Sequence, residues 1–86
     1  MKKLEKKLKA LANRRRLAIL AGLKQEGQMT VGSVARHIGL SLNATSRHLV
    51  ILYAAGIIEK EQRSLEVFCM LPPDLPLFVR QVIDQL

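Results

Sequence analysis

The sequence is poor in aromatic residues and contains a single cysteine. It has no tryptophan, one tyrosine and two phenylalanines, so aliphatic side chains must fill its core. The lone Cys69 excludes an internal disulfide, and it excludes a metal cluster built only from cysteines of one chain. A thiol sensor generally needs a second, resolving cysteine, so we expect Cys69 to be a small core residue.

Long apolar runs are also missing. No stretch approaches the roughly 18 residues that a membrane-spanning helix needs, and the basic N-terminus lacks the continuous apolar region of a signal peptide. A single cysteine also fits a reducing compartment, so we expect a cytoplasmic protein with no membrane span. Paired carboxylates, a Ser/His/Asp arrangement and a glycine-rich phosphate loop are not visible. We therefore expect no enzymatic activity and no cofactor.

Basic and aliphatic residues dominate the composition of the chain. The 86 residues are 49% apolar, which is enough for one globular domain over residues 1–86 with a modest core. The net charge of +7 favours a polyanionic partner. Eight of the fourteen basic residues lie within the first sixteen positions. The lysines among them are also consistent with a solvated, solubilising helix face.

Residues 31–38 and the residues after Ser41 are predicted to form two helices joined by a short turn. Thr30 and Ser41 are good N-caps, because their hydroxyls can accept free backbone N–H groups of a first helical turn. Gly39 can end the first helix. The residues expected to face inward from that helix are apolar: Val31, Val34, Ala35 and Ile38. A helix, a glycine-containing turn and a second helix are the signature of a helix-turn-helix unit.

The second of these helices has an unusual outer face. Its expected buried stripe recurs at spacings of four and three: Thr45, Leu49 and Leu52. The opposite side carries Asn43, Ser46 and Arg47, followed by Val50. Asparagine can pair bidentately with adenine, and arginine with guanine. We therefore predict a recognition helix that enters the DNA major groove and ends at Gly56.

Two helices are expected before this unit. Residues 2–12 carry a narrow apolar stripe of Leu4, Leu8 and Leu11 among lysines. Asn13 can cap a helix over about 14–24, whose predicted buried side is Leu17, Ile19, Leu20 and Leu23. Residues 24–28 are predicted to form a loop. The first stripe is too thin to anchor a core, so it is expected to contact a partner subunit or, as an alternative, an anionic membrane surface.

Two strands and a helix are expected after the unit. Residues 57–62 and 65–71 are predicted as strands of a hairpin that turns at Arg63-Ser64, and such a hairpin is a "wing". Pro72 and Pro73 end the second strand. A final helix, roughly 74–86, begins near Asp74 with Pro76 in its first turn. Its apolar arc is wider than one small domain can bury, which favours a homodimer built on 1–12 and 74–86.

The predicted fold is therefore mainly α, within the α+β class: a winged helix-turn-helix of about five helices with a two-stranded wing. The sequence resembles the ArsR family of winged-helix repressors. Residues 11–20 resemble its opening motif L-A-D/N-P-x-R-x-x-I-L, and residues 34–41 resemble L-A-x-x-L-G-L-S. Residues 46–57 resemble S-R-H-L-x-x-L-x-x-A-G-L, and the likeness extends over about residues 8–71.

The resemblance implies a dimeric DNA-binding repressor. Carried over by position, Asn43, Ser46 and Arg47 would contact the major groove. Leu42 stands where a polar, DNA-reading glutamine is common, and Leu65 stands where the wing often has a basic residue. Val50 replaces a frequent lysine, and Arg14 replaces the usual proline.

The family's metal ligands have no counterparts here. Its third-helix site uses a Cys-x-Cys pair, but the corresponding residues 28–33 contain no cysteine. Its interfacial site uses Asp, His and Glu on the last helix, which here has only Asp74 and Asp84. His37 and His48 lack a second ligand at i+3 or i+4. We expect His37 at the surface, His48 packed beside the recognition helix, and no metal or small-molecule effector.

The sequence thus predicts a homodimeric transcriptional regulator that binds a pseudo-palindromic site on double-stranded DNA and acts as a repressor, or else as an activator. The predicted DNA-contacting residues of the recognition helix are Ser41, Leu42, Asn43, Ser46 and Arg47. The predicted phosphate contacts are Arg14, Arg15, Arg16, Arg36, Lys60 and Arg63. The alternatives are a winged-helix module that binds another protein and an amphipathic segment on a membrane surface.

Overall fold

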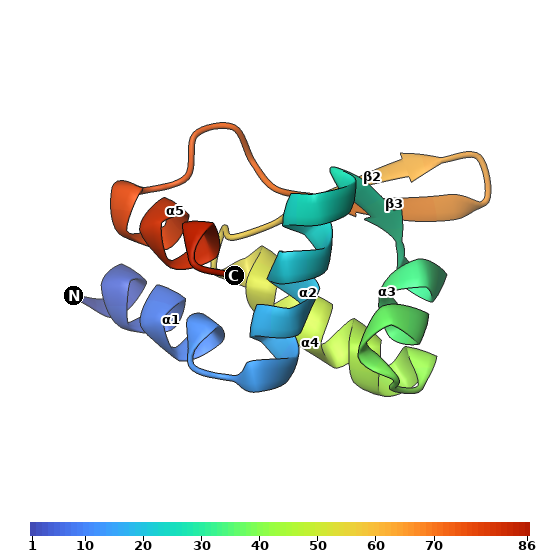
Figure 1. Cartoon of the computed structure of the whole chain (residues 1–86), viewed down its shortest axis with the longest axis horizontal. Coiled ribbons are helices and arrows are strands. Elements are labelled where there is room, and N and C mark those ends of the chain that lie inside the picture. The colour runs from blue at the N-terminus through green and yellow to red at the C-terminus, as the bar shows by residue number, and fades with distance from the viewer.

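A computed structural model describes all residues 1–86 and contains five helices (Figure 1). They are α1 (Lys2–Leu11), α2 (Arg14–Glu26), α3 (Val31–Ile38), α4 (Leu42–Ala54) and α5 (Leu77–Asp84). Three short strands complete the fold: β1 (Gln28–Thr30), β2 (Glu59–Arg63) and β3 (Glu66–Met70). The winged helix-turn-helix architecture expected from the sequence is confirmed.

Side-chain caps begin three of the helices at the residues the sequence predicts. The Asn13 side chain accepts hydrogen bonds from the backbone N–H groups of Arg15 and Arg16. Thr30 accepts from the N–H of Ser33, and Ser41 accepts from the N–H of Ala44 at 3.1 Å. Each cap satisfies N–H groups that have no partner inside the helix. The start of the recognition helix α4 is thereby fixed.

Glycines with positive φ end α3 and α4 as expected. Gly39 lies in the left-handed region with φ 68°, and Gly56 follows α4 with φ 74°. A side chain is unfavourable in this region, so glycine is the natural residue at these stops. The helix-turn-helix therefore has a short and defined turn between Ile38 and Leu42.

The prediction of a loop over 24–28 is wrong. Helix α2 continues through Glu26, and only Gly27 intervenes before β1. Strand β1 pairs antiparallel with β3, with Met29 opposite Cys69, so the sheet has three strands in the order β1-β3-β2. Three residues are too few to show an alternating pattern, and β1 exists because β3 offers it an open edge.

The hairpin is also shifted from its predicted position. Ile57 and Ile58 are buried before β2 begins at Glu59, and they belong to the connection rather than to the strand. The turn is Ser64-Leu65, because Arg63 pairs with Glu66 across the strands. Ser64 has φ 56°, which is a turn conformation that the sequence did not mark with glycine or asparagine.

Helix α5 begins later than predicted. It starts at Leu77 with Pro76 as its N-cap, and residues 74–76 precede it as part of the connection. A proline fits there, because its missing N–H would have no helical partner. Leu75 is buried in this connection, so its side chain reaches the core from outside the helix.

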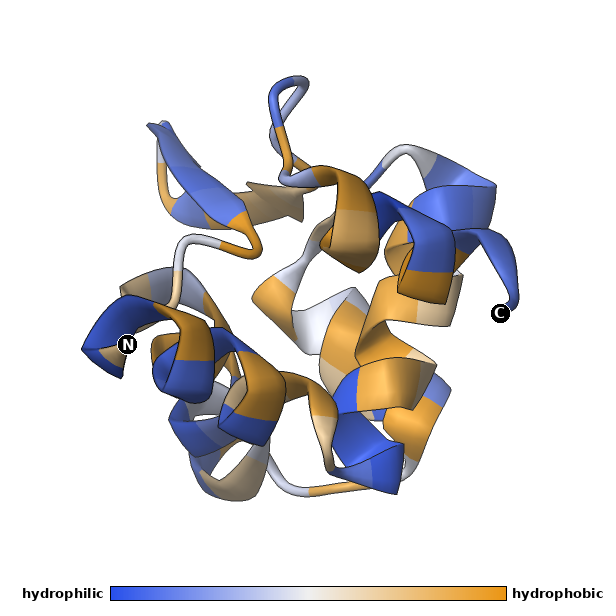
Figure 2. Ribbon diagram, turned by 90° about the vertical axis from the view of Figure 1, so that its left-hand side faces the viewer, coloured by the Kyte–Doolittle hydropathy of each residue, from blue (hydrophilic) through white to orange (hydrophobic).

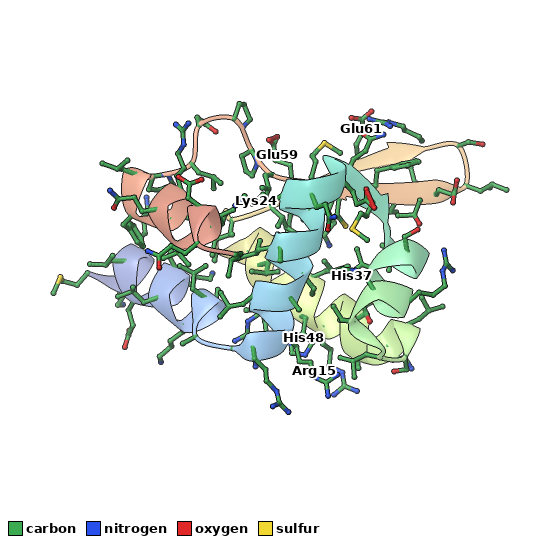
Figure 3. All side chains as sticks on the ribbon, in the orientation of Figure 1. Arg15, Lys24, His37, His48, Glu59 and Glu61 are labelled. Carbon is green, nitrogen blue, oxygen red and sulfur yellow. The ribbon has the colours of Figure 1, made fainter.

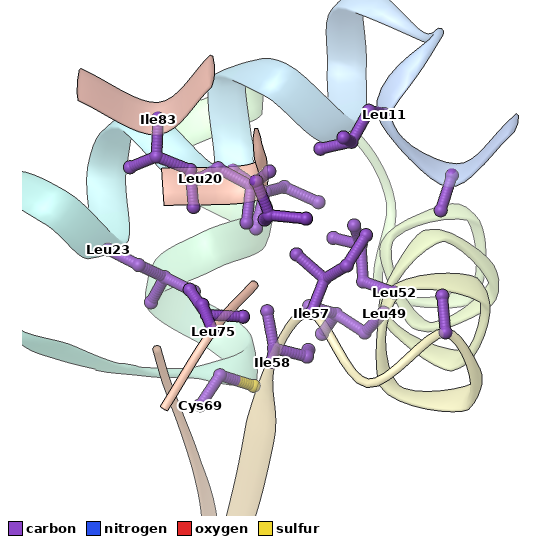
Figure 4. Close-up of a cluster of buried hydrophobic side chains, with 14 of the residues drawn as sticks. Leu11, Leu20, Leu23, Leu49, Leu52, Ile57, Ile58, Cys69, Leu75 and Ile83 are labelled. Atoms are coloured by element: carbon purple, nitrogen blue, oxygen red, sulfur yellow. The ribbon is translucent and has the colours of Figure 1, made fainter. Parts of the chain in front are cut away.

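All five helices and β3 contribute to one core (Figure 4). The core includes Leu20 and Leu23 of α2 and Leu49 and Leu52 of α4, and Ile57 lies beside the two α4 leucines. Leu17, predicted on the buried side of α2, is only half-buried, whereas Ala10 of α1 is fully buried. Aliphatic packing of this kind holds α4 on the body of the fold and leaves its outer side free.

The end of the molecule that carries both termini keeps apolar surface exposed. α1 and α5 lie at this end, opposite the β2–β3 hairpin (Figure 1), and both alternate hydrophobic and hydrophilic residues (Figure 2). Leu4, Leu8 and Leu77 are exposed, although Val79 and Ile83 are buried in the core. Within one chain, the apolar arc predicted for the last helix is thus only partly covered.

Candidate nucleic-acid interface

The outer face of α4 presents Asn43, Ser46 and Arg47. All three side chains are exposed, and none has a hydrogen bond or ion pair within the chain. Ser46 and Arg47 follow Asn43 by three and four residues, so both lie on its side of the helix. Thr45, Leu49 and Leu52 on the opposite face are buried, as the sequence predicts. The arrangement leaves amide, hydroxyl and guanidinium groups free to bind an outside partner.

A groove runs between the start of α4, the start of α3 and the hairpin. Its lining includes Leu42 and Ser46 of α4, Arg36 of α3, and Leu65 and Glu66 at the tip of the hairpin. Arg36 also donates to the Ser33 hydroxyl at 3.2 Å, which holds its guanidinium along α3. The recognition helix and the wing therefore form two walls of one groove, open to solvent.

The three consecutive arginines at the start of α2 have different surroundings. Arg14 is exposed and has no partner in the chain. Arg15 donates to the backbone oxygen of Ile38 at 3.4 Å, close to the end of α3. Arg16 is bound from several sides. The sequence alone groups these residues as one basic run, but the structure separates them.

Arg16 connects α1 to the recognition helix. Its Nε donates to the oxygen of Ala10 at 2.6 Å, and its Nη2 donates to the oxygen of Lys9 at 3.1 Å. Its Nη1 lies 3.2 Å from Nδ1 of His48 on α4. Sequence reasoning missed this role, since neither partner on α1 is identified by its side chain. The resemblance of residues 11–20 to the family motif was the only available signal.

His48 therefore accepts from Arg16 in its neutral form, near Arg15 where α2 begins (Figure 3). Partial burial lowers the pKa of His48, and the charges of Arg16, Arg15 and Arg47 lower it further. His48 is a half-buried residue of α4 itself, rather than a residue packed beside that helix. His37 is exposed as expected, and its ring lies over Gly22, where an added Cβ would come within 3.0 Å of it.

The two cations of the hairpin are already engaged. The Arg63 guanidinium pairs with Glu61 at 2.8 Å and lies over the Phe68 ring at 4.6 Å from its centroid. The hydrogen bond between them lowers the pKa of Glu61 and raises that of Arg63. The Lys60 ammonium lies 4.8 Å from the centroid of the Tyr53 ring. These contacts hold both cations against the protein.

The helix-turn-helix unit is also identified by comparison with known proteins. The family model described as "Helix-turn-helix domain" matches residues 11–61, which run from the end of α1 to the middle of β2. The nodulation protein NolR of Rhizobium meliloti is 38% identical over 61 residues, or 71% of this chain. The transcriptional activator HlyU of Vibrio cholerae has the same identity over the same share.

The chain belongs to the ArsR family of winged helix-turn-helix transcriptional regulators. The matched segments span 49% of NolR and 56% of HlyU, about half the length of these curated relatives. The solved structure of HlyU is 32% identical, covers 96% of this chain and 86% of its own, and has a TM-score of 0.82.

A second structure in the family is described as the homodimeric winged helix-turn-helix DNA-binding domain of Mb0332 from Mycobacterium bovis. It is 27% identical, covers 98% of this chain and 74% of its own, and has a TM-score of 0.83. Both structures match nearly all of the chain, including α1, α5 and the hairpin. The resemblance to the ArsR family noted in the sequence is confirmed.

The potential metal ligands of this ArsR-family chain are dispersed. No three His, Cys, Asp or Glu side chains lie close enough together to hold one ion. Cys69 is buried on β3, and its burial raises the pKa of the thiol. None of the helices combines the length and the apolar character needed to cross a lipid bilayer.

Proposed function

We propose that this ArsR-family chain is a sequence-specific DNA-binding transcriptional regulator that acts as a homodimeric repressor. One observation carries the proposal: α4 begins at a fixed cap and presents unpartnered Asn43, Ser46 and Arg47 on its outer face. A helix of this kind fits the B-DNA major groove, where amide and guanidinium groups distinguish bases. The net charge of +7 supplies attraction to the phosphates.

In this proposal, Asn43 and Arg47 determine the base preference. Ser46 fixes the position of α4 along the DNA. Ser41 and Leu42 lie at the first turn, beside the groove that the hairpin also lines. Ser41 would donate its hydroxyl hydrogen to a phosphate oxygen, and Leu42 would contact the C5-methyl group of a thymine. These roles follow from chemistry and exposure on α4.

The predicted phosphate contacts divide into two groups. Arg14, Arg15 and Arg36 can reach a phosphate with little rearrangement, because each has at most one weak or exposed contact. Arg16, Lys60 and Arg63 would have to leave partners within the chain. We propose that the first group makes the larger electrostatic contribution, and that the second group contributes less.

The exposed leucines of α1 and α5 support the homodimer. Leu4, Leu8 and Leu77 are exposed at one end of the molecule, and a second copy would remove them from water. A two-fold dimer would place two recognition helices about 34–36 Å apart, one turn of DNA, on a pseudo-palindromic site. The homodimeric description of the Mb0332 domain agrees with this proposal. Repression would follow from occupying a promoter.

We further propose that regulation does not use the metal ligands of the family. A zinc site needs three or four converging nitrogen or sulfur ligands, whereas this chain offers only dispersed His, Cys and carboxylate groups. Abundance of the protein, or a partner, would then set the occupancy of the promoter.

Selection from random DNA at about 150 mM salt is the test, because non-specific binding is weakened there. An enriched inverted repeat with half-sites about one helical turn apart supports the proposal. Retention without enrichment would replace it with non-specific binding. Failure to retain DNA at all would refute it and favour a protein-docking module.

Substitution of Arg47 then tests the assignment of base contacts. Arg47→Ala is expected to cost about 1–3 kcal/mol at the selected site and to relax the preference at one base pair. The matched control is Arg14→Ala, which should weaken all sequences alike and reduce the salt slope by about one unit. Uniform weakening by both variants would remove Arg47 from the reading role.

A further inference from the structure

We infer that Leu65, at the tip of the hairpin, inserts into the DNA minor groove as an apolar wedge. The inference rests on the proposed function, since it adds a second reading element to a DNA-bound protein. Leu65 is the second residue of the two-residue turn between β2 and β3, and it is 95% exposed. No other part of the chain covers it.

The electrostatics of the hairpin argue against an ordinary phosphate contact. Residues 59–66 contain three glutamates, one lysine and one arginine, a net charge of −1 in a chain of net charge +7. The arginine is paired with Glu61, and the lysine lies over Tyr53. A hairpin with this balance gains little from phosphates, so any favourable contact must come from its apolar tip.

The position of the tip selects DNA as its partner. Leu65 and Glu66 line the same groove as Leu42 and Ser46 at the first turn of α4. With α4 in a DNA major groove, the hairpin, which forms the opposite wall of the protein groove, lies across the sugar-phosphate backbone. The tip of the hairpin then faces the adjoining DNA minor groove. The hairpin projects from the body there (Figure 1).

The chemistry of a leucine suits that location. Apolar side chains that enter the minor groove unstack a base step and bend the duplex, and leucine is among the residues used in this way. Flexible pyrimidine–purine steps are the easiest to open. The tip would therefore favour such a step beside each half-site, and it would add preference at positions that α4 does not reach.

Two substitutions at the tip separate apolar insertion from the shape of the turn. Leu65→Asn keeps a residue that tolerates turns and removes the apolar side chain. Leu65→Met, the matched control, keeps an apolar side chain of similar size. We expect about tenfold weaker binding of the selected DNA for Leu65→Asn, and nearly wild-type binding for Leu65→Met. The slope of log affinity against log salt should be unchanged in both, because no charge is removed.

A fluorescent base reports the insertion directly. 2-Aminopurine at the step flanking each half-site should brighten when the wild type or Leu65→Met binds, and it should stay quenched with Leu65→Asn. Equal affinity of all three proteins, with no brightening, would overturn the inference while leaving the proposed function intact. If the wild type selects no DNA sequence, the proposed function itself fails. A steeper salt slope in the wild type than in Leu65→Asn would also refute a wedge.

Discussion

Arg16 offers the sharpest test of how the fold supports its recognition helix. Its guanidinium donates to the oxygens of Lys9 and Ala10 at the end of α1 and lies against His48 on α4. Arg16→Ala removes all three contacts at once. The backbone oxygen of the fully buried Ala10 then loses the hydrogen bond that it accepts from Arg16 at 2.6 Å. We therefore expect α1 to loosen from the body of the fold.

The size of the effect follows from the number and kind of these bonds. A hydrogen bond to a charged group is worth about 1.5–3 kcal/mol, but contacts that share one side chain do not add in full. Arg16 is only half-buried, so water replaces part of the loss. We expect the free energy of unfolding to fall by about 2–3 kcal/mol, which lowers Tm by roughly 10–20 °C in a domain of this size. The difference in helix propensity between Arg and Ala is only a few tenths of a kcal/mol.

Urea denaturation at fixed protein concentration measures the loss, and hydrogen exchange locates it. Amides of α1 should lose protection more than amides of β3, because Arg16 contacts only α1 and α4. Arg16→Lys should fall between the wild type and Arg16→Ala, since an ammonium cannot reproduce the planar fork. A loss below about 0.5 kcal/mol for Arg16→Ala, against the 1.5–3 kcal/mol of a single charged hydrogen bond, would refute this role for the contacts.

Two further predictions concern residues of α4. The pKa of His48 is lowered in the fold, first by burial and then by the charges of Arg16, Arg15 and Arg47. The unfolded chain therefore binds the proton more readily than the folded chain. The stability that His48 contributes above about pH 6.5 should be lost as the pH falls. His48→Gln should flatten the fall of a stability-against-pH curve below about pH 6.5, and an unchanged curve would contradict the assignment. The Thr45 hydroxyl is fully buried without a hydrogen-bond partner, so the isosteric Thr45→Val should stabilise the fold by about 1 kcal/mol in urea titrations and leave DNA affinity unchanged. Destabilisation by Thr45→Val would show that the hydroxyl has a partner.

The helix boundaries that are set by side chains could be predicted from the sequence. Asn13, Thr30 and Ser41 cap α2, α3 and α4 as expected, and Gly39 and Gly56 mark stops. Caps and positive-φ glycines are local signals, so they can be identified without knowledge of the fold. The exposed face of α4 could be predicted for the same reason, from spacing alone.

The boundaries that depend on distant contacts could not be predicted. Strand β1 forms because it pairs with the open edge of β3. Ile57 and Ile58 are buried in the core that α2 and α4 share, so they do not belong to β2. The hairpin turn lies at Ser64-Leu65 without a glycine, because pairing across the strands sets its register. The late start of α5 depends on Leu75 reaching the core from the preceding connection.

The same distinction governs the interpretation of charge. The basic run at 14–16 and the cations of the hairpin look alike in the sequence, as candidates for phosphate contact. In the structure, Arg16 joins two helices and Arg63 neutralises a glutamate, whereas Arg14 and Arg47 stay free. Under the proposed function, a count of positive charges therefore overestimates the number of cations that are free to contact phosphates. If α4 is the main contact, the salt slope of binding should reflect the few free arginines near it and fall well below one unit for every basic residue of the chain.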